Sequence, residues 1–579
     1  MASADKLNCG IGQPELNPAL QGQETVLLQR VLMPFSTNER KDVLISGGRI
    51  SKIACAGSLS TTGVTMDCTE RLLMPGFVNA HTHSIEHWTK GLIKPLPLEL
   101  WVQQLIRKEP RGQEGWEGED SFLKTPSSAV GLSAMHCGVE SLLSGCTAVL
   151  DHLFIRNMED LAAAVDAYKA VGVRAFISPM LNDDAEMYTN YIPLVPDAAD
   201  RNCHGGCCGM GENGEFRTKK SPSDPEKTAA CLKLWEEAVQ RFHDPKAGIE
   251  IVIGPVTVYS ASEELLRGAA QLRKKYNLCG HTHLLETRSQ ALQARQWFKS
   301  GSAVQQLKDT GFLDGRGTSL AHSIWLSREE QRLCAETGAV LVHNPLSNLR
   351  LGSGVAPLLK YAAKGIAVAI GTDGSASSDG QDLIEALKLA SFLPRVTTPD
   401  YRAWPSAREM ALENASKNGY RAIGMPDGGE LKEGMVADVS LWDLSSLALL
   451  PRTDPVNLLV MGSRTQAPGA GSTLACMWVR GVRVVKEGAP CGVDLQRLRA
   501  VLAHAQRDYR DPESTDPSAC TETLAFETEY RAALQLDGTS SGRGEAFSED
   551  CVLYSPTLKA GHEEVVPNGQ CGSGYPTPA

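Results

Sequence analysis

Histidine and carboxylate side chains recur at the ends of short apolar runs in this chain. The first run ends in His81 and His83. Because side chains two apart on a strand point the same way, both imidazoles can reach one metal ion. A later run ends in His283, with Glu286 three residues further on. The spacing therefore predicts a metal site with an acidic group beside it.

Two further runs end in the same kinds of residue. His322 follows Ala321 at the end of one run, and Asp373 lies in the segment Gly371 to Gly374 at the end of another. A single histidine at a strand end is more often a hydrogen-bonded core residue than a metal ligand. Because such features occur together in separate segments, three histidines and an aspartate indicate a site for Zn²⁺ or Fe²⁺ with a position left for water.

The chain alternates short apolar runs with longer helical patterns, which is typical of βα units around a parallel sheet. Eight apolar runs are Phe77 to His83, Cys146 to Leu153, Val173 to Leu181, Ile249 to Val256, Leu278 to Leu285, Ser319 to Trp325, Val340 to Asn344 and Ile366 to Asp373. The helical patterns include Met158 to Ala170, Glu263 to Tyr276, Arg328 to Gly338 and Gln381 to Leu393. We expect an α/β fold with a (β/α)₈ TIM-like barrel over residues 73–425, and reactive side chains at the carboxyl ends of its strands.

Short segments with a β pattern stand on both sides of the expected barrel. A hairpin pattern covers Asp42 to Ile53, and similar patterns recur in Ala437 to Trp442 and Met477 to Val485. We predict that residues 25–72 and 426–490 build one small composite β-sandwich, with the barrel inserted between its two parts.

Two regions fall outside this plan. Residues 185–229 interrupt the repeat with Gly, Asn, Pro and Lys, so we expect a surface insertion. Its cysteine cluster, Cys203 to Cys208, could indicate a zinc knuckle, but no second ligand pair stands at zinc-finger spacing. In residues 491–579, the sequence pattern predicts a helix over Asp494 to Tyr509. The Ser/Thr/Gly/Pro/Glu-rich tail that follows is expected to lack a fixed fold.

The composition narrows the range of partners and compartments. The chain has 579 residues with 57 basic and 68 acidic side chains, a net charge of −11, so we expect a small-molecule substrate and no nucleic acid. No apolar stretch of about 18 residues and no export signal occurs, so no membrane association is expected. The 16 cysteines include no CxxC pair, which favours reduced thiols in the cytoplasm.

Three segments resemble signatures of the amidohydrolase superfamily, specifically its metal-dependent deaminase and s-triazine hydrolase branch. They are Leu73 to His83, His343 to Gly354 and Gly371 to Ser377, and the resemblance spans roughly residues 25 to 490. The loop Gly374 to Gly380 is also similar to that of 8-oxoguanine deaminases. The resemblance implies a metal-dependent hydrolase.

The resemblance also implies a ligand set. His81, His83, His283 and Asp373 would hold one divalent metal ion, zinc or iron. His281 does not occupy a ligand position of the family. The run Ile249 to Val256 contains no Lys where binuclear relatives carry a carboxylated one, so a single ion is expected.

The chemistry of such a site gives the remaining residues their roles. A divalent ion lowers the pKa of bound water towards about 7, and the resulting hydroxide attacks an electron-poor ring carbon. Asp373 would accept the water's proton, His322 would orient the attacking oxygen, and Glu286 would protonate the adjacent ring nitrogen. The expected reaction is hydrolytic deamination of an aminated nitrogen heterocycle, such as a purine or nucleoside, with release of ammonia.

Substrate contacts are expected from Glu99, Trp101 and His322. The segment around Glu99 resembles the part of methylthioadenosine and S-adenosylhomocysteine deaminases in which a Glu holds ribose hydroxyls and a Trp lines the pocket. Alternatively, Glu99 begins a solvated helix and Trp101 is a core residue. Val256 stands where adenosine-type members carry a His and cannot donate a hydrogen bond. The ring therefore stays open between adenine, an oxidised guanine, another aminated heterocycle and a triazine.

Two other functions stay open from the sequence. One is hydrolytic displacement of chloride or an alkylamine from an s-triazine-like ring, which product analysis would distinguish from deamination. The other is a non-catalytic scaffold, although chains of that kind tend to lose ligands and none of the set is missing here. Relatives commonly form homodimers, so a homodimer is the expected assembly.

Overall fold

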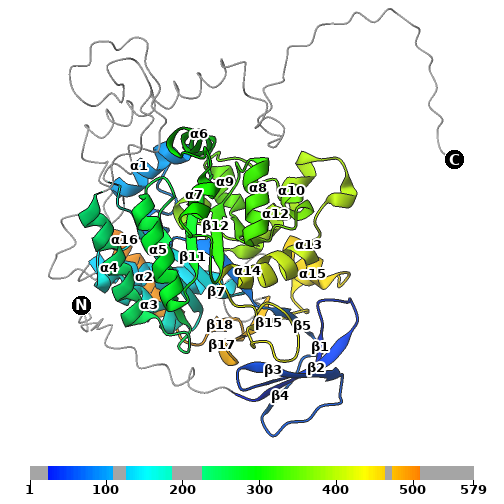
Figure 1. Cartoon of the computed structure of the whole chain (residues 1–579). Helices are drawn as coiled ribbons and strands as arrows, with labels where there is room; N and C mark the ends of the chain where they lie inside the picture. The colour runs from blue at the N-terminus through cyan, green and yellow to red at the C-terminus, as the bar shows by residue number, and fades with distance from the viewer. Residues whose placement is uncertain (1–23, 109–125, 185–223, 463–472, 509–579) are drawn as a thin grey trace, which may run out of the picture.

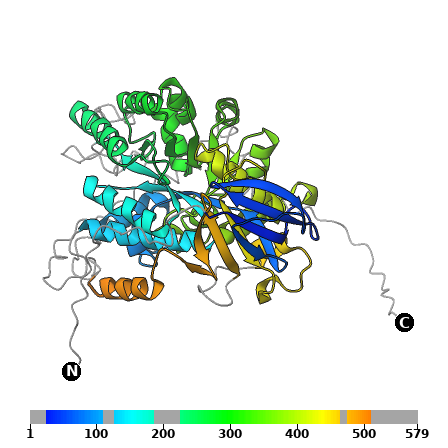
Figure 2. The ribbon, with the colours of Figure 1, turned by 90° about the horizontal axis from the view of Figure 1, so that it is seen from below.

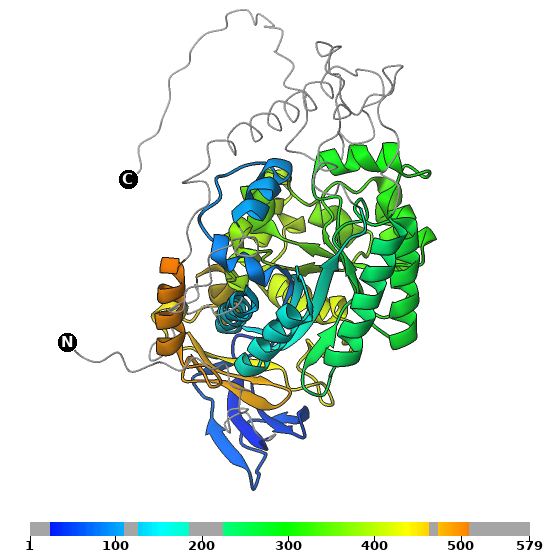
Figure 3. The ribbon, with the colours of Figure 1, turned by 90° about the vertical axis from the view of Figure 1, so that its left-hand side faces the viewer.

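The structure is a computed structural model that describes residues 24–108, 126–184, 224–462 and 473–508. Helices surround a central group of parallel strands, and a smaller β unit lies against one end of that body (Figures 1 and 3). Within the described ranges, no helix has both the length and the apolar character needed to cross a membrane.

The central strands form two parallel sheets. Their orders are β10-β8-β7-β6, with β9 paired to β8, and β11-β12-β13-β14. The strands are β6 (Phe77–Thr82), β7 (Cys146–Leu153), β8 (Arg174–Leu181), β9 (Ile249–Ile251), β10 (Gly254–Pro255), β11 (Gly280–Leu284), β12 (Thr318–His322), β13 (Val340–His343) and β14 (Val368–Ile370). All eight predicted runs are found as strands, and the fourth run is split between β9 and β10.

Backbone hydrogen bonds connect the two parallel sheets at both of their edges. At one edge, Ile253 donates to the carbonyl of Cys279 at 3.1 Å and accepts from the amide of His281 at 3.1 Å. At the other, the amide of Asp373 donates to the carbonyl of His81 at 3.0 Å. The strands are parallel within each sheet, and these bonds draw the carboxyl ends of β6, β11 and β14 together.

Helices connect successive strands and cover them from outside. The predicted helices are found as α3 (Met158–Val171), α5 (Glu263–Tyr276), α8 (Arg328–Thr337) and α12 (Leu383–Thr397). The others are η2 (Ser84–Thr89), α1 (Leu98–Lys108), α2 (Pro126–Leu143), α4 (Pro225–Phe242), α6 (Arg288–Trp297), α7 (Ala303–Asp309), α9 (Pro345–Arg350), α10 (Leu358–Ala363), α11 (Ser375–Ser378), η5 (Tyr401–Ala403), α13 (Ala407–Glu409), η6 (Met410–Lys417), α14 (Asn418–Ala422), η7 (Leu447–Leu449), α15 (Pro455–Met461) and α16 (Leu495–Asp508). Local sequence sets their starts: in α8, Ser327 and Glu330 form a reciprocal capping box.

The smaller β unit joins segments from both parts of the chain. Its nine strands have the order β18-β17-β16-β15-β5-β1-β2-β3, with β4 paired to β1. They are β1 (Val26–Leu32), β2 (Arg40–Ser46), β3 (Arg49–Cys55), β4 (Val64–Asp67), β5 (Arg71–Pro75), β15 (Val439–Asp443), β16 (Leu474–Val479), β17 (Val482–Lys486) and β18 (Ala489–Pro490). Strand β5 pairs antiparallel with β15, so the early and late segments lie side by side (Figure 2). These hydrogen bonds define one composite sheet, and its division into two layers stays a prediction.

The expected insertion over residues 185–229 overlaps the start of a helix, and its boundary stays a prediction. Residues 225–229 are the first turns of α4, because Asp224 caps this helix by accepting from the amides of Glu226 and Lys227, and Pro225 occupies its first turn. The remainder of the insertion, with Cys203 to Cys208, lies outside the described residues. In the last region, the predicted helix is found as α16, and the tail beyond residue 508 lies outside the described residues as well.

A buried ion pair fastens the parallel strands to the composite sheet. Arg174, at the start of β8, donates from Nε to Oδ2 of Asp438 at 2.6 Å, just before β15. Asp438 also accepts from the Tyr420 hydroxyl at 2.8 Å and from the backbone amide of Arg480 at 2.6 Å. Because these donors satisfy both carboxylate oxygens, the burial of the two charges is compensated.

Replacing the acidic partner tests this junction. Asp438→Asn is expected to lower the free energy of unfolding by about 3–5 kcal/mol, because it leaves the Arg174 charge buried without a counter-charge. Glu237→Gln is the control: it removes the exposed pair with Arg241 on α4 and should cost less than about 1 kcal/mol. Urea unfolding followed by circular dichroism measures both, and equal effects would contradict a structural role for the buried pair.

Candidate active site

The four predicted metal ligands lie together at the carboxyl ends of three strands. His81 belongs to β6, His83 follows it, His283 belongs to β11, and Asp373 follows β14. Oδ1 of Asp373 lies 3.3 Å from Nε2 of His81 and 3.4 Å from Nε2 of His83. The Nε2 atoms of His83 and His283 are 3.1 Å apart. The structure thus brings the whole predicted set into one cluster.

Main-chain carbonyls fix which nitrogen of two rings carries the proton. Nδ1 of His83 lies 2.6 Å from the carbonyl of His152, and Nδ1 of His283 lies 2.7 Å from the carbonyl of Val256. A carbonyl can only accept, so each Nδ1 is the protonated donor and each Nε2 presents a lone pair. Two lone pairs 3.1 Å apart repel each other unless a cation lies between them. This geometry fits a divalent metal ion.

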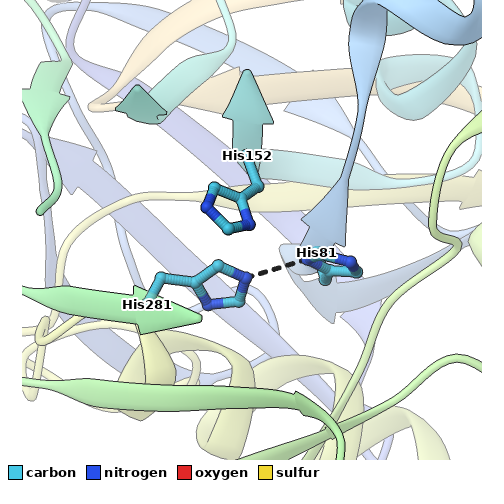
Figure 4. A group of neighbouring side chains, drawn as sticks. All are labelled: His81, His152 and His281. Carbon is cyan, nitrogen blue, oxygen red and sulfur yellow. Dashed lines mark hydrogen bonds between the residues drawn. The ribbon is translucent and has the colours of Figure 1, made fainter. Parts of the chain in front are cut away.

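A second layer of histidines lies behind the ligands (Figure 4). Nδ1 of His81 is 2.8 Å from Nε2 of His281, whose own Nδ1 is 2.7 Å from Oγ of Ser319. Nε2 of His81 is buried and has no hydrogen-bond partner among the described residues, so it is the nitrogen left for a metal. His281 therefore supports His81 from behind, in keeping with its expected absence from the ligand positions.

One member of the layer behind the ligands was missed by sequence reasoning. His152 is fully buried near the end of β7, beside His81 and His281 (Figure 4). Its carbonyl orients His83. The available signal was its position at the carboxyl end of the second apolar run, where the other site residues of this fold also stand.

Burial favours the neutral form of three imidazoles at this site. It lowers the pKa of His81 to about 4 and the pKa values of His281 and His283 well below their ordinary value. Burial alone would raise the pKa of Asp373, but the close approach of the His81 ring holds it well below its ordinary value. The cluster therefore offers neutral nitrogens and one carboxylate, which are the donors that Zn²⁺ takes.

Glu286 and His322 lie beside the ligand cluster. Oε2 of Glu286 is 3.6 Å from Nε2 of His322, which is in turn 3.8 Å from Oδ2 of Asp373. The Ser353 hydroxyl donates to Oε1 of Glu286 at 3.1 Å, and Oδ1 of Asn348 lies 2.9 Å from Nδ1 of His322. Burial raises the pKa of Glu286 to about 7, so this carboxyl group can hold a proton near neutral pH.

The backbone at these strand ends adopts an uncommon conformation. His322 has a φ of 68°, Asp373 of 66°, Ser323 of 49° and Leu285 of 44°, and none of them is a glycine. Left-handed conformations of such residues cost of the order of 1–3 kcal/mol each and persist where surrounding contacts impose them. Two of the four carry the side chains that face each other in the site.

The structure excludes one of the two interpretations of Glu99. This residue lies in the first turn of α1 but is only 1% exposed, so the solvated-helix interpretation is wrong. Its Oε1 accepts from the Thr287 hydroxyl at 2.6 Å, directly after Glu286. Its Oε2 is buried and has no hydrogen-bond partner among the described residues.

Trp101 is packed in a local apolar cluster. It is 5% exposed and contacts a group that includes Ile93, Leu105 and Leu351. Its Nε1 is buried and has no hydrogen-bond partner in the part of the chain that the structure describes. Trp101 is therefore buried among apolar side chains while its Nε1 stays available as a donor, and both interpretations of this residue stay open.

Comparison with known proteins shows which family this chain resembles. The model of the amidohydrolase family matches residues 72–469. A 5-methylthioadenosine/S-adenosylhomocysteine deaminase of Pyrococcus furiosus is 30% identical over 459 residues, which are 79% of this chain and 94% of that protein. A 5'-deoxyadenosine deaminase of Methanococcoides burtonii is 30% identical over 419 residues, 72% of this chain and 82% of that protein.

Solved structures are similar over most of the chain. A zinc complex of atrazine chlorohydrolase from Arthrobacter aurescens has a TM-score of 0.66 at 24% identity, covering 83% of this chain and 100% of that one. An adenosine deaminase from Xanthomonas campestris with bound zinc has a TM-score of 0.65 at 23% identity, and the match covers 84% of this chain and 98% of that chain. The family match and these two likenesses imply a TIM-barrel fold.

The protonation of Glu99 makes stability depend on pH. Burial raises its pKa from 4.5 to about 7 in the folded protein. The contribution of the protonated group to stability is therefore complete at pH values below the pKa of the unfolded chain, and it is lost as the pH rises through about 7. Glu99→Gln should therefore raise the free energy of unfolding at about pH 8 by up to about 3 kcal/mol and change it little in acid. Unfolding at a series of pH values measures this, with the exposed Glu264→Gln as control. A gain for Glu99→Gln that does not vary with pH would contradict a buried, protonated carboxyl.

Proposed function

The chain belongs to the amidohydrolase family, and on that premise we propose that it hydrolyses the exocyclic amine of a purine nucleoside or a related nitrogen heterocycle. It is a hydrolase of carbon–nitrogen bonds, consistent with the deaminase names of its relatives. The observation that carries the proposal is the convergence of three imidazole Nε2 atoms and the Asp373 carboxylate beside Glu286.

His81, His83, His283 and Asp373 would hold one divalent ion, zinc or iron. The carbonyl bonds at Nδ1 of His83 and His283 and the free Nε2 of His81 support this assignment. Such an ion lowers the pKa of water, so that hydroxide is available near neutral pH. The run Ile249 to Val256 offers no lysine for a second ion at this centre.

Three side chains of the site move or direct protons in this proposal. Asp373 accepts the proton of the attacking water through Oδ2, the oxygen that faces His322. His322, whose Nδ1 lies against Asn348, orients the attacking oxygen with Nε2. Glu286, whose pKa burial raises to about 7, gives a proton to the ring nitrogen and regains one from the added hydroxyl group as the carbonyl forms, while the proton held by Asp373 goes to the leaving amine.

Glu99, Trp101 and His322 are the proposed substrate contacts. The buried Oε2 of Glu99 has no partner among the described residues and would accept hydrogen bonds from hydroxyl groups, as expected for a ribose. The relatives named for adenosine thioethers and 5'-deoxyadenosine support a nucleoside. Val256 supplies only a carbonyl to His283 and no side-chain donor, so contacts to the base would differ from those expected of adenosine-type deaminases.

The finer architecture is part of the proposal. We take the two parallel sheets as one closed (β/α)₈ barrel over residues 73–425, supported by the backbone bonds at both edges. Residues 25–72 and 426–490 would form the sandwich, and residues 491–579 the helix and tail. A cytoplasmic location and a homodimer stay predictions from the sequence.

Displacement of chloride or an alkylamine from a triazine-like ring is the second candidate. The apolar side chain of Val256 favours it, because a ring without purine contacts needs no donor there. The scaffold hypothesis has no observation in its support, since the whole predicted set lies together. Product analysis separates deamination from displacement of chloride or an alkylamine, because only removal of a primary amine releases ammonia.

Ammonia release from a panel of aminated rings tests the proposal. The panel contains adenosine thioethers, 5'-deoxyadenosine, guanine, 8-oxoguanine, cytosine and melamine-type triazines. Glu286→Gln should lower kcat by about 10²- to 10⁴-fold with the bound metal unchanged, because it removes the proton donor. Glu330→Gln, at a buried carboxyl that caps α8, is the control and should keep kcat. Release of chloride or alkylamine without ammonia would overturn the proposal in favour of the second candidate.

Metal removal tests the ligand set separately. Dialysis against a chelator should abolish activity, and added zinc or iron should restore it. His83→Ala should lower the metal content by one ion per chain relative to the wild type, because it removes one of four ligands. His243→Gln, at the end of α4, should keep both metal and activity. Full activity of the metal-free chain would refute a metal-dependent mechanism.

A further inference from the structure

A second group of potential metal ligands lies outside the candidate active site. His87 belongs to η2, and His136 and Glu140 lie one turn apart on α2. Nε2 of His87 is 3.2 Å from Oε2 of Glu140, and Nε2 of His136 is 3.4 Å from Oε1. One donor atom from each residue can be chosen so that all three lie within 4.8 Å of one another. The two imidazole rings lie 4.6 Å apart, so both face the same carboxylate.

The neutral ring of His87 has one N–H group but faces two hydrogen-bond acceptors. Nδ1 lies 3.1 Å from the carbonyl of Ser84, which can only accept, and Nε2 faces the carboxylate of Glu140. Burial lowers the pKa of His87, so the ring carries one proton for these two acceptors. Burial would raise the pKa of Glu140, but the nearby rings of His136 and His87 hold it below its ordinary value. With Nδ1 bonded to the carbonyl, a lone pair faces a carboxylate, and that contact needs a cation.

The surroundings of the group leave room for an exchangeable ion. The His87 side chain is only 3% exposed, whereas those of His136 and Glu140 are 27% and 28% exposed, so one side of the group opens to solvent. Lys90 lies at this rim with Nζ 3.0 Å from Oε1 of Glu140. Partly exposed ion pairs of this kind contribute little to stability, so the ammonium can withdraw at little cost.

We propose that His87, His136 and Glu140 form a second binding site for a divalent cation of the zinc type, separate from the catalytic centre. The ligands are Nε2 of both histidines and the Glu140 carboxylate, and the fourth position faces solvent. Two imidazoles and a carboxylate are a donor set that zinc accepts, with the remaining position taken by water. The inference does not depend on the proposed reaction.

An ion in this site would connect two elements next to the catalytic ligands. Helix η2 begins directly after His83, and α2 packs against it. Oγ of Ser375, two residues beyond Asp373, lies 3.4 Å from the His87 ring. Occupation would therefore hold η2 against α2 and reduce the movement of the segment that follows His83.

Zinc stoichiometry tests the site in the full-length protein with its catalytic metal in place. Equilibrium dialysis against added Zn²⁺, followed by elemental analysis, should show one fewer ion per chain in His136→Ala and in Glu140→Gln than in the wild type. His243→Gln should match the wild type. The readout is the difference between variants and not the total, so that zinc bound elsewhere in the chain, such as by the cysteines of Cys203 to Cys208, cancels out. Equal zinc content in the wild type and both variants would overturn the proposal.

A gain of affinity provides a test that does not depend on removing a ligand. Lys90→Ala removes the cation that competes for Glu140 and should tighten binding of the second zinc ion several-fold. Added zinc should also raise the melting temperature of the wild type more than that of His136→Ala. If His136→Ala and Glu140→Gln fail to fold by circular dichroism, Lys90→Ala decides: tighter binding supports the site, and unchanged binding overturns it.

Discussion

The position of the imidazole protons is the constraint on which the candidate active site depends. Nδ1 of His83 and of His283 each donates to a main-chain carbonyl, and those carbonyls belong to the strand end at His152 and to the loop at Val256. The tautomer of each ring is therefore set by the sheet and not by mobile side chains. The Nε2 atoms of the two rings lie 3.1 Å apart, and their lone pairs point to one place close to the Asp373 carboxylate. The strand ends matter because they place these carbonyls independently of any bound ion.

This arrangement is costly, and the rest of the fold compensates for it. Neutral imidazoles are buried with few partners, and His322 and Asp373 adopt left-handed backbone conformations. Such strain persists only where neighbouring contacts are rigid. The apolar core beneath the strands and the buried pair of Arg174 with Asp438 provide that rigidity, the latter by tying β8 to the composite sheet. Stability and reactivity thus reside at opposite ends of the parallel strands: the start of β8 is anchored, and the carboxyl ends of β12 and β14 are strained.

The sequence predicts much of this fold because its main signals are local. Apolar runs and helical periodicity identify the strands and helices, and the two-residue spacing at His81 and His83 predicts that both rings share a face. The unexpected features all depend on contacts between distant segments. The support of His81 by His281 joins residues 200 positions apart. The break between β9 and β10 covers Val252 and Ile253, and Ile253 there exchanges backbone hydrogen bonds with Cys279 and His281.

The two buried carboxyl groups connect proton transfer with substrate recognition. Glu99 and Glu286 are joined through Thr287, whose hydroxyl donates to Glu99 and whose backbone follows Glu286 directly. Burial raises the pKa of both to about 7, and the charge of Glu286 contributes to the shift at Glu99. A substrate hydroxyl that donates to Oε2 of Glu99 would stabilise the ionised form of that group. Its negative charge would then favour the protonated form of Glu286, which is the form that a proton donor requires. Binding of a hydroxyl-bearing substrate would in this way prepare the acid for the reaction.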